Sequence, residues 1–423
     1  MPQGRPDFRS RYRQRAHDEA HADESPVADV DVPAHVPAFR GKPELITTQA
    51  ALVDHIAHLR TNGSFAYDSE FIGESSYHPV LCLVQTATVE TVGLIDPMAD
   101  LDLTPFWELL ADPAVGKIVH AGAQDVEPVF RAINKPVANL FDTQIAAGFV
   151  ALAYPASLQK LTLVTTGINL AKGLTFTQWD QRPFSAKQLR YAADDVRYLP
   201  AVAAEVKRRL EKTGHAQWAA AECAALCEPG QYRFNPATAV EKVRGSGSLA
   251  GNQLSALLDL AIWRDGAARE ANLPSRAFLK DEILIDLVRN RPKTPEQLGR
   301  IRGLPRPTID RQGQHLIDLI TAGLAKPYTG PVAERGAEPT VAQRFAADAL
   351  WTAAQAICQN NSIDPAAVTS RQEIGDLHRA LVSGASPDTL RLMTGWRREA
   401  LGDRLVELWT TRAPVTFTLP AEA

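Results

Sequence analysis

The stretch Phe65-Ala66-Tyr67-Asp68-Ser69-Glu70-Phe71 constrains the fold more than any other part of the chain. A β-strand points successive side chains to opposite faces, so Ser69 shares one face with the aromatic residues while Asp68 and Glu70 share the other. Two carboxylates on one face are costly to bury unless positive charge lies between them, and a divalent metal ion is the commonest source of that charge. By itself the stretch fits two interpretations equally: a metal-binding strand, and a half-exposed edge strand whose acidic face is solvated.

Composition sets the broad class of protein. The chain has 423 residues, of which 45% are hydrophobic and 22% charged, as in ordinary soluble globular proteins of roughly two to four domains. The formal net charge of -4 gives no support for a nucleic-acid partner, so only local basic patches can supply it. The sequence shows no apolar run of about eighteen residues and no signal peptide, so we expect no membrane segment.

The cysteines indicate a reducing compartment. Cys82, Cys223, Cys227 and Cys358 form neither a CxxC pair nor a cluster with histidines. Cys223 and Cys227 are four apart in an Ala-rich stretch, where small buried residues of a helix are expected rather than metal ligands. We therefore expect free thiols and a cytoplasmic protein.

Residues 1–42 read as a disordered N-terminal arm. Five arginines lie between Arg5 and Arg15, with Phe8 and Tyr12 among them, and an acidic stretch follows. Such an arm is able to contact RNA phosphates and bases. A solvated tail without a specific role is the simpler interpretation.

From residue 43 the pattern alternates between helix and strand. The spacing predicts a helix over 48–60 that ends at Asn62-Gly63, then the opening strand, and then a hairpin of strands over 80–86 and 91–96. A helix over 104–110 and a strand over 116–120 follow. This order predicts a mixed sheet covered by helices, with active residues along one edge.

Further acids follow the sheet strands. Asp125 is predicted in the first turn of a helix that begins after the strand ending at His120. Asp142 is predicted to cap a helix reaching about residue 152, and another helix is expected over 158–166, ended by Gly167. In a long helix predicted over 186–210, Tyr191 and Asp195 project from one face because they are four residues apart, while Asp194 points elsewhere.

These residues resemble a known set of motifs. DxE at Asp68 and Glu70, HxxxxD from His120 to Asp125, and YxxxD from Tyr191 to Asp195 are similar to the three exonuclease motifs of the DEDD superfamily, and the tyrosine is typical of its DEDDy branch. The sequence around these motifs makes the resemblance more specific: it is similar to the ribonuclease D family, continuously from about residue 65 to residue 199. The stretches that carry this resemblance are ESSYHPVLCLVQT, IDPMADLDL, NLFDTQIAA, QWDQRPF and YAADDVRYL.

Two departures from the family pattern stand out. The family's usual DTEF is DSEF here, which changes only Ser69, and we expect Ser69 to face away from the chemistry. The usual SDW is replaced by Thr177-Gln178-Trp179 in a region near substrate, which leaves substrate preference open.

The resemblance implies an α/β ribonuclease H-like fold and two divalent metal ions, Mg²⁺ or Mn²⁺, that stabilise the attacking and leaving oxygens of a phosphodiester displacement. It implies that Asp68 bridges both ions, that Glu70 and Asp195 bind one, and that Asp125 helps to hold the other, largely through water. It also implies that Tyr191 orients a metal-bound water toward the terminal phosphate.

Five further residues are weaker candidates. His78, Gln85 and Trp179 are candidates to contact the terminal nucleotide, although the sequence does not separate this from packing. His120 and Gln124 flank the second motif, where hydrogen bonding at the sheet edge is a better interpretation than direct catalysis.

The rest of the chain is predicted to be helical. Within residues 249–326, WRDGAARE, LPSRAFLKDE and Gly303 resemble the HRDC domain, and NNSIDPAAVTSRQEI and TGWRREALG resemble the degenerate second HRDC domain of the family. The basic residues of the first module suggest a phosphate-binding face, and mixed charge on solvated helices is the usual alternative. The expected organisation is an arm over 1–42, the exonuclease domain over 43–211, a connector over 212–248 that ends in the flexible run Gly245–Ser248, an HRDC domain over 249–326, a linker over 327–339, a second HRDC-like domain over 340–412 and a tail over 413–423.

The resemblance therefore implies a metal-dependent 3′ to 5′ exoribonuclease that trims structured RNA ends, tRNA precursors above all, and releases nucleoside 5′-monophosphates. It also implies a monomer. A DNA exonuclease of the same superfamily is the nearest alternative. A non-catalytic RNA-binding scaffold on the same fold is an alternative of another class, and the presence of all four acids and the tyrosine argues against it.

Overall fold

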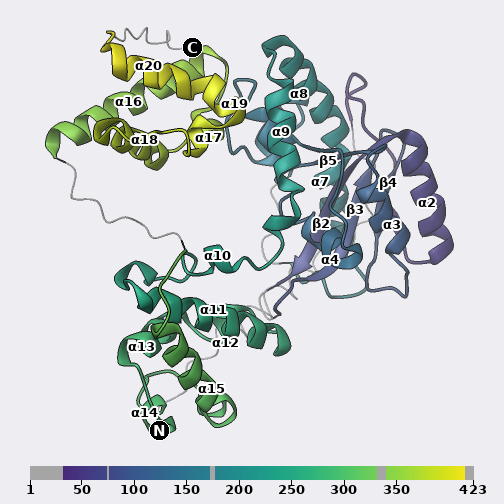
Figure 1. Ribbon diagram of the computed structural model, residues 1–423. Coiled ribbons are helices and arrows are strands. Elements are labelled where there is room, and N and C mark those ends of the chain that lie inside the picture. Colours follow the sequence, from purple (N-terminus) through teal and green to yellow (C-terminus); the bar gives the residue numbers. More distant parts are fainter. Residues whose placement is uncertain (1–31, 74–75, 172–176, 331–339, 415–423) are drawn as a thin grey trace, which may run out of the picture. The chain divides into compact units, whose positions relative to one another are not determined.

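A computed structural model describes residues 32–73, 76–171, 177–330 and 340–414 (Figure 1). Its contacts divide the chain into two units. The sheet unit comprises the described parts of Met1–Glu70, Cys82–Glu228 and Ala337–Ala423, and the helical unit comprises those of Phe71–Leu81 and Pro229–Gly336. In the part of the chain that the structure describes, no helix is long and apolar enough to cross a membrane.

The sheet unit is built on a six-stranded mixed sheet with the order β1-β4-β3-β2-β5-β6. β3 and β4 pair antiparallel, as the predicted hairpin requires, while β1 pairs parallel with β4, and β5 pairs parallel with both β2 and β6. The strand that carries Asp68 and Glu70 is therefore central. The strands are β1 Glu44–Ile46, β2 Ser64–Ile72, β3 Val80–Ala87, β4 Val92–Ile95, β5 Gly116–Val119 and β6 Leu140–Asp142.

Helices lie on both sides of this sheet, with α2 and α3 on one side and α7 and α8 on the other (Figure 1). The local signals hold where they are strongest: the Thr48 side chain caps α2, and Gly63 ends it in the left-handed conformation with φ 73°. Asp142 caps α5 by accepting hydrogen bonds from two backbone N–H groups. The helices are α2 Gln49–Asn62, α3 Thr104–Ala111, α4 Glu127–Ile133, α5 Thr143–Ala147, α6 Leu158–Thr166, α7 Ala186–Arg197, α8 Leu199–Thr213 and α9 Ala216–Leu226.

Two predicted helices are shorter than expected. The long helix over 186–210 is two helices, α7 and α8, which meet at Tyr198. Pro200 stands in the first turn of α8, where its missing N–H costs nothing, whereas inside one continuous helix it would break the hydrogen-bond ladder. The helix after Asp142 ends at Ala147 rather than near residue 152.

The end of the predicted disordered arm is folded. Residues 1–31 lie outside the described part, but Val32, Val36 and Ala38 are buried against Tyr198 and Ala201. The buried Arg197 guanidinium donates to the backbone carbonyls of Phe39 at 2.7 Å and Gly41 at 3.1 Å. For residues 32–41 the prediction of disorder is therefore wrong, because three spaced apolar residues pack on the helix junction that follows the third motif.

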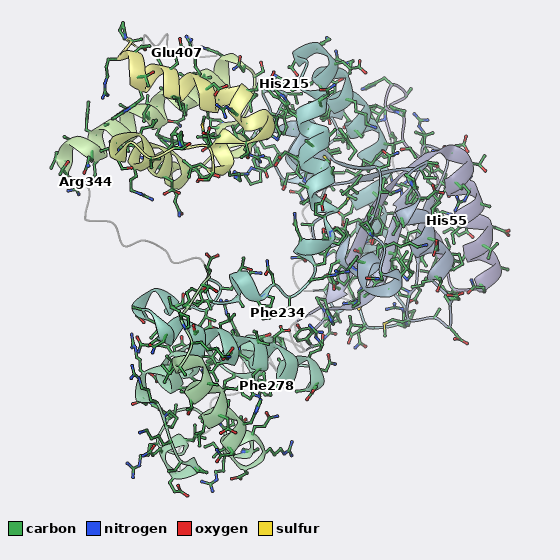
Figure 2. All side chains as sticks on the ribbon, in the orientation of Figure 1. His55, His215, Phe234, Phe278, Arg344 and Glu407 are labelled. Atoms are coloured by element: carbon green, nitrogen blue, oxygen red, sulfur yellow. The ribbon has the colours of Figure 1, made fainter. Side chains whose placement is uncertain are left out.

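The C-terminal helices share a hydrophobic core with the sheet unit. Phe149, Val150 and Val206 lie in one buried cluster with Leu377 and Leu401. Two backbone hydrogen bonds also join the segment after α5 to the C-terminal helices, from Ala151 N to Ser362 O at 2.6 Å and from Asp364 N to Gly148 O at 2.7 Å. The ring of His215, which lies at the start of α9 (Figure 2), stacks on that of Trp218, and the ring of Trp396 also stacks on Trp218. The helical elements of this C-terminal segment are α16 Val341–Asn360, α17 Pro365–Val368, α18 Arg371–Ser383, α19 Gly395–Arg397, a π-helical turn Arg398–Gly402 and α20 Asp403–Thr411.

The helical unit has a core of its own, in which Leu257, Leu284 and Leu316 are fully buried. Its helices are α10 Pro236–Ala239, α11 Asn252–Glu270, α12 Ser275–Phe278, α13 Asp281–Asn290, α14 Pro295–Leu298 and α15 Arg306–Leu324. Part of the stretch predicted as a connector belongs to this core, since Val240 and Val243 are buried in it. Gly245–Ser248, predicted as a flexible run, contains a 3-10 turn over Ser246–Ser248.

One further segment belongs to the helical unit. The segment that follows Glu70 joins it through Tyr77, whose hydroxyl donates to Asp265 at 2.7 Å. The backbone N–H of Tyr77 donates to the Asn272 side chain at 3.2 Å.

Candidate active site

The central strand β2 presents its two carboxylates on one face. The rings of Phe65 and Tyr67 pack against Phe106 of α3, with centroid distances of 6.5 and 6.1 Å. Because side chains alternate along a strand, Asp68 and Glu70 project from the opposite face, the side of the sheet on which α7 lies.

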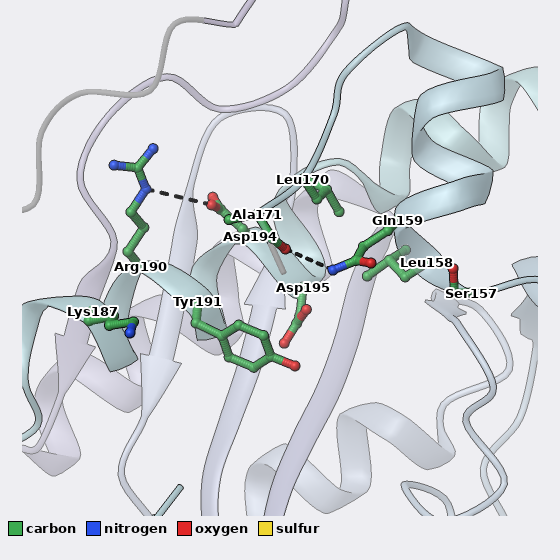
Figure 3. A pocket seen from close by; sticks show the side chains of 10 residues that line it. All are labelled: Ser157, Leu158, Gln159, Leu170, Ala171, Lys187, Arg190, Tyr191, Asp194 and Asp195. Atoms are coloured by element: carbon green, nitrogen blue, oxygen red, sulfur yellow. Dashed lines mark hydrogen bonds and ion pairs between the residues drawn. The ribbon is translucent and has the colours of Figure 1, made fainter. Parts of the chain in front are cut away.

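Helix α7 brings the third motif to the same place. A capping box formed by Ser185 and Gln188 fixes its start. The Tyr191 side chain lies beside the Asp195 carboxylate, as their spacing predicts, and the charge of Asp195 helps to raise the pKa of the tyrosine hydroxyl (Figure 3). Asp194 turns away to Arg197 at 3.1 Å and Arg190 at 3.8 Å (Figure 3).

Asp125 is not in the first turn of a helix. Helix α4 begins only at Glu127, with Pro128 in its first turn, so Asp125 lies in the turn before it. The backbone N–H of Asp125 closes that turn on Gly122 O at 3.1 Å, and the Tyr67 hydroxyl donates to the Asp125 backbone carbonyl at 2.9 Å. The prediction that Asp125 lies in the first turn of a helix, where the helix dipole stabilises its carboxylate, is therefore wrong. Side chains of β2 contact Asp125 instead.

The structure corrects the expectation that Ser69 faces away from the chemistry. Its hydroxyl donates a hydrogen bond to Oδ1 of Asp125, and its backbone N–H also donates to the Asp125 carboxylate. The alternation along β2 was assigned correctly. What the sequence did not show is that the turn after β5 brings the second motif to the face of β2 that Ser69 shares with Tyr67.

Burial, and after it the charge of neighbouring carboxylates, raises the pKa of every carboxyl in the site. Burial is the largest cause in each case; it raises the pKa of Glu70 to about 8, of Asp195 to about 7 and of Asp125 to about 6. The pKa of Asp68 is raised well above its usual value by burial and then by the charges of Asp125, Asp195 and Glu70. Among the described residues no cationic side chain opposes any of these four shifts.

The donor set fits divalent cations. Four carboxylates without a cationic neighbour concentrate the charge and the hard oxygen ligands that Mg²⁺ and Mn²⁺ prefer. Within the described ranges, however, no three His, Cys, Asp or Glu side chains already converge as a ready metal cluster.

A cavity of about 250 Å³ opens beside the acids. Tyr191 and Asp195 line one part of it, and the exposed side chains of Lys187 and Arg190 line another (Figure 3). Gln159 lies on a further wall, where its amide donates to the carbonyl of Ala171 at 2.8 Å. The cavity thus joins a carboxylate site to two cations, an arrangement suited to a ligand with phosphate groups.

Comparison with known proteins decides the family. Residues 43–211 match the family model described as a 3′–5′ exonuclease, and residues 253–320 match the HRDC domain. The chain is 34% identical to ribonuclease D of Gluconacetobacter diazotrophicus over 86% of its own length and 92% of the relative's. It is 32% identical to ribonuclease D of Bartonella henselae, with coverage of 86% and 89%. The chain belongs to the ribonuclease D family.

A solved structure of the ribonuclease D family has the same fold. The crystal structure of Escherichia coli RNase D, described as an exoribonuclease involved in structured RNA processing, superposes with a TM-score of 0.75 at 27% identity. The match covers 88% of this chain and 99% of that one. This agreement confirms the predicted class, a mixed-sheet exonuclease domain followed by helical domains, and it makes this ribonuclease D homologue an enzyme.

In this member of the ribonuclease D family two of the weaker candidates are buried. Gln85 has no exposed surface, and neither atom of its amide has a hydrogen-bond partner among the residues that the structure describes. Trp179 is 5% exposed, with its ring centroid 6.2 Å from that of Tyr191. Arg182 fixes the loop that holds Trp179 by donating to both oxygens of Asp96 at 2.6 and 2.5 Å.

The other three candidates differ among themselves. Both ring nitrogens of His120 are hydrogen-bonded, one to the Thr143 hydroxyl at 3.0 Å and one to the Ala156 carbonyl at 3.1 Å, which fits the hydrogen-bonding role expected for it. Gln124 is exposed in the turn before Asp125. His78 is exposed in the helical unit, where its ring meets the edge of Tyr77.

Proposed function

We propose that the chain is a metal-dependent exoribonuclease that removes nucleotides from RNA 3′ ends and releases nucleoside 5′-monophosphates. One observation carries the proposal: four carboxyls on β2, α7 and the turn after β5 all have raised pKa values, and they lie beside a tyrosine whose pKa the carboxylates also raise. Such an arrangement is unfavourable in a resting scaffold and favourable in a site that binds cations during catalysis.

Asp68, Glu70, Asp125 and Asp195 would hold the cations. When bound, two divalent ions supply a nucleophilic hydroxide at neutral pH and stabilise both the attacking and leaving oxygens of an in-line displacement. Asp68 is the best candidate for the shared ligand, because its pKa responds to all three other acids.

Tyr191 acts as a hydrogen-bond donor. Burial and the neighbouring carboxylates raise the pKa of its hydroxyl, so the hydroxyl keeps its proton throughout the working pH range. A group that stays protonated orients a water or a phosphate oxygen rather than removing a proton. We assign Tyr191 the positioning of the attacking water against the terminal phosphate.

The cavity beside Tyr191 would receive the 3′-terminal nucleotides. Lys187 lies one helical turn before Tyr191 and Arg190 lies at the same cavity, so both are placed to meet the phosphates that lead to the scissile bond. These cations contribute to RNA affinity, whereas the acids contribute to the reaction itself.

The helical unit would hold the body of the RNA. Between Arg289 and Arg311 the chain carries seven basic residues, all exposed, against the two acids Glu296 and Asp310. Only Arg306 among the seven forms an ion pair within the described residues, at 3.0 Å to Asp310. The seven are Arg289, Arg291, Lys293, Arg300, Arg302, Arg306 and Arg311. A surface of this kind binds phosphates without reading sequence.

Structured RNAs such as tRNA precursors are the substrates that we propose. The E. coli relative is described as acting in structured RNA processing, and a chain that combines a phosphate-binding helical unit with an exonuclease domain fits that class of RNA. The four cysteines are free, as a reducing cytoplasm keeps them, and we propose that compartment and a monomer.

The test offers 3′-extended tRNA precursor, unstructured RNA and DNA of matched sequence to the wild type, to Asp68→Asn and to Asp96→Asn. Asp96 is a buried acid that pairs with Arg182, so its variant controls for removal of a buried charge outside the proposed site. We expect stepwise RNA shortening in Mg²⁺ that EDTA and Asp68→Asn abolish and that Asp96→Asn retains. Shortening that persists in EDTA would exclude the metal mechanism, and DNA degraded as fast as RNA would exclude the substrate.

A further inference from the structure

The turn that carries Asp125 is held by side chains rather than by regular structure. After β5 ends at Val119, Ala121 takes the left-handed conformation with φ 58°, which a residue other than glycine adopts only at a cost. The Asp142 carboxylate holds this corner by accepting from the backbone N–H groups of Ala121 at 3.1 Å and Gly122 at 2.9 Å. The corner is thus fixed from β6, one strand further along the sheet.

The far end of the same turn is fixed from β2. The Tyr67 hydroxyl holds the Asp125 backbone carbonyl, and the Ser69 hydroxyl and backbone N–H hold the Asp125 carboxylate. β2 and β5 pair from Ser64 to Ala66 and from Gly116 to Ile118, so this part of β2 extends past the paired segment. The backbone N–H groups of β2 that would have paired with a longer β5 are therefore free to donate to the second motif.

We propose that Ser69 is a positioning residue of the proposed metal site: its hydroxyl selects the orientation in which the Asp125 carboxylate faces Asp68. Asp125 is only 6% exposed, so water does not compete strongly for its carboxylate oxygens. A carboxylate that accepts a hydrogen bond at Oδ1 presents its other oxygen in a fixed direction. Without the hydroxyl, the side chain retains only backbone donors and gains freedom to rotate.

This role explains how two opposite faces of one strand serve one site. Asp68 and Glu70 supply carboxylates directly. Ser69 lies between them in sequence and supplies no carboxylate, but from the other face of the strand it orients the carboxylate of Asp125. A β-strand is rigid, so the three side chains keep a constant relation to one another. The position requires a hydroxyl rather than a particular size.

The inference rests on the proposed function, and the experiment separates the two. Mn²⁺ binding to the metal-free full chain is measured by calorimetry, and the activity of each variant is measured against Mg²⁺ concentration. The variants are Ser69→Ala, which removes the hydroxyl, Ser69→Thr, which keeps it, and Ser69→Val, which matches threonine in shape. Ser64→Ala, on the same strand but at its other end, is the control.

We expect Ser69→Ala and Ser69→Val to weaken Mn²⁺ binding and to raise the Mg²⁺ requirement on the order of tenfold, the factor that loss of one hydrogen bond to a charged group produces. Ser69→Thr and Ser64→Ala should stay within about twofold of the wild type, and the KM for RNA at saturating Mg²⁺ should not change.

Two results overturn the proposal. One is unchanged Mn²⁺ binding in Ser69→Ala. The other is an equal loss of Mn²⁺ binding in Ser69→Thr and Ser69→Val, which would mean that steric crowding, rather than a lost hydrogen bond, weakens binding. If the wild type binds no Mn²⁺ or Asp68→Asn remains active, the proposed function fails and this inference fails with it. Thermal unfolding in EDTA reports whether each variant folds, and the threonine and valine pair decides the question if the alanine variant does not.

Discussion

The guanidinium of Arg397 donates two hydrogen bonds to the carboxylate of Glu222, at 2.7 and 2.5 Å, and so joins the C-terminal helices to α9 of the sheet unit. The pair is largely buried, with side-chain exposures of 10% for Arg397 and 22% for Glu222, and the indole of Trp396 donates to the same carboxylate at 2.8 Å. This contact lies at the edge of the shared core that contains Phe149 and Leu401. The C-terminal segment is therefore a structural part of the sheet unit.

Arg397→Met should destabilise the sheet unit by about 2 to 3 kcal/mol. Truncating one partner of a buried pair leaves the other charge uncompensated, and the cost stays below that of a fully buried pair because Glu222 keeps some exposure. Arg404→Met is the control, since Arg404 pairs with Glu407 at the surface, where both side chains are more than half exposed. Urea denaturation of both variants measures the difference, and equal stabilities would contradict the assigned role.

Truncation after Lys326 should yield an insoluble or partly unfolded protein. It removes the described helices from Val341 onward and uncovers an apolar surface around Phe149, Val150 and Val206. In contrast, a fragment of residues 236–328 should be soluble and helical, because it contains the whole core of the helical unit. Circular dichroism and thermal unfolding distinguish the two; a well-folded, active 1–326 chain would show that the C-terminal core is dispensable.

The metal-free enzyme should lose stability as the pH rises from about 4 to about 8. The carboxyls of Asp125, Asp195 and Glu70 have folded-state pKa values of about 6, 7 and 8, above their unfolded values. The folded state therefore binds more protons than the unfolded state in this window, so its stability is fully present below pH 4 and is lost as each raised pKa is passed.

Divalent cations should reverse this loss. The increase in Tm on addition of Mg²⁺ should be small near pH 5 and should grow by several degrees toward pH 8, because the cations replace the protons that keep the carboxylates neutral. Thermal scans with Mg²⁺ and with EDTA at matched ionic strength measure it. A metal-induced shift that is constant across this pH range would mean that the four acids are not the binding site.

Tyr191→Phe should reduce kcat about 100-fold and leave Mn²⁺ binding and the KM for RNA nearly unchanged. The variant removes only the hydroxyl beside Asp195, so the proposed metal ligands and the cavity remain while the reacting water is less well placed. Tyr154→Phe, which changes a tyrosine outside the motifs, should keep full activity. A Tyr191 variant that fails to bind Mn²⁺ would instead assign the tyrosine to the support of Asp195.

Sequence reasoning succeeded where local chemistry decides the structure. The capping residues Thr48 and Gly63 mark the two ends of a helix. The alternation of side chains along β2 assigns its two faces correctly. The grouping of Tyr191 with Asp195 follows from helical spacing alone. The mixed sheet and its cover of helices follow from the alternation of the two patterns along the chain, whereas the order of strands within the sheet was not predicted.

The errors arose where a distant segment decides a residue's environment. Ser69 was assigned to the correct face, but nothing in its own strand shows that the turn after β5 brings Asp125 to that face. Val32 and Val36 lie in a polar, Pro-containing segment, and only the packing surface on α7 and α8 reveals their role. Pro200 was visible, and the break before it was predictable from its missing N–H.

The shared core also has a consequence for synthesis of the chain on the ribosome. Phe149 and Val206 are made early, whereas Leu377 and Leu401, which cover them, are translated only after the whole helical unit. A nascent chain that has emerged as far as α15 therefore carries the described β-sheet and the four carboxylates of the proposed site, but its α5 and α8 still present an uncovered apolar face. Completion of this core waits until α16 to α20 have been translated, and until then that face is a site at which chaperones can bind.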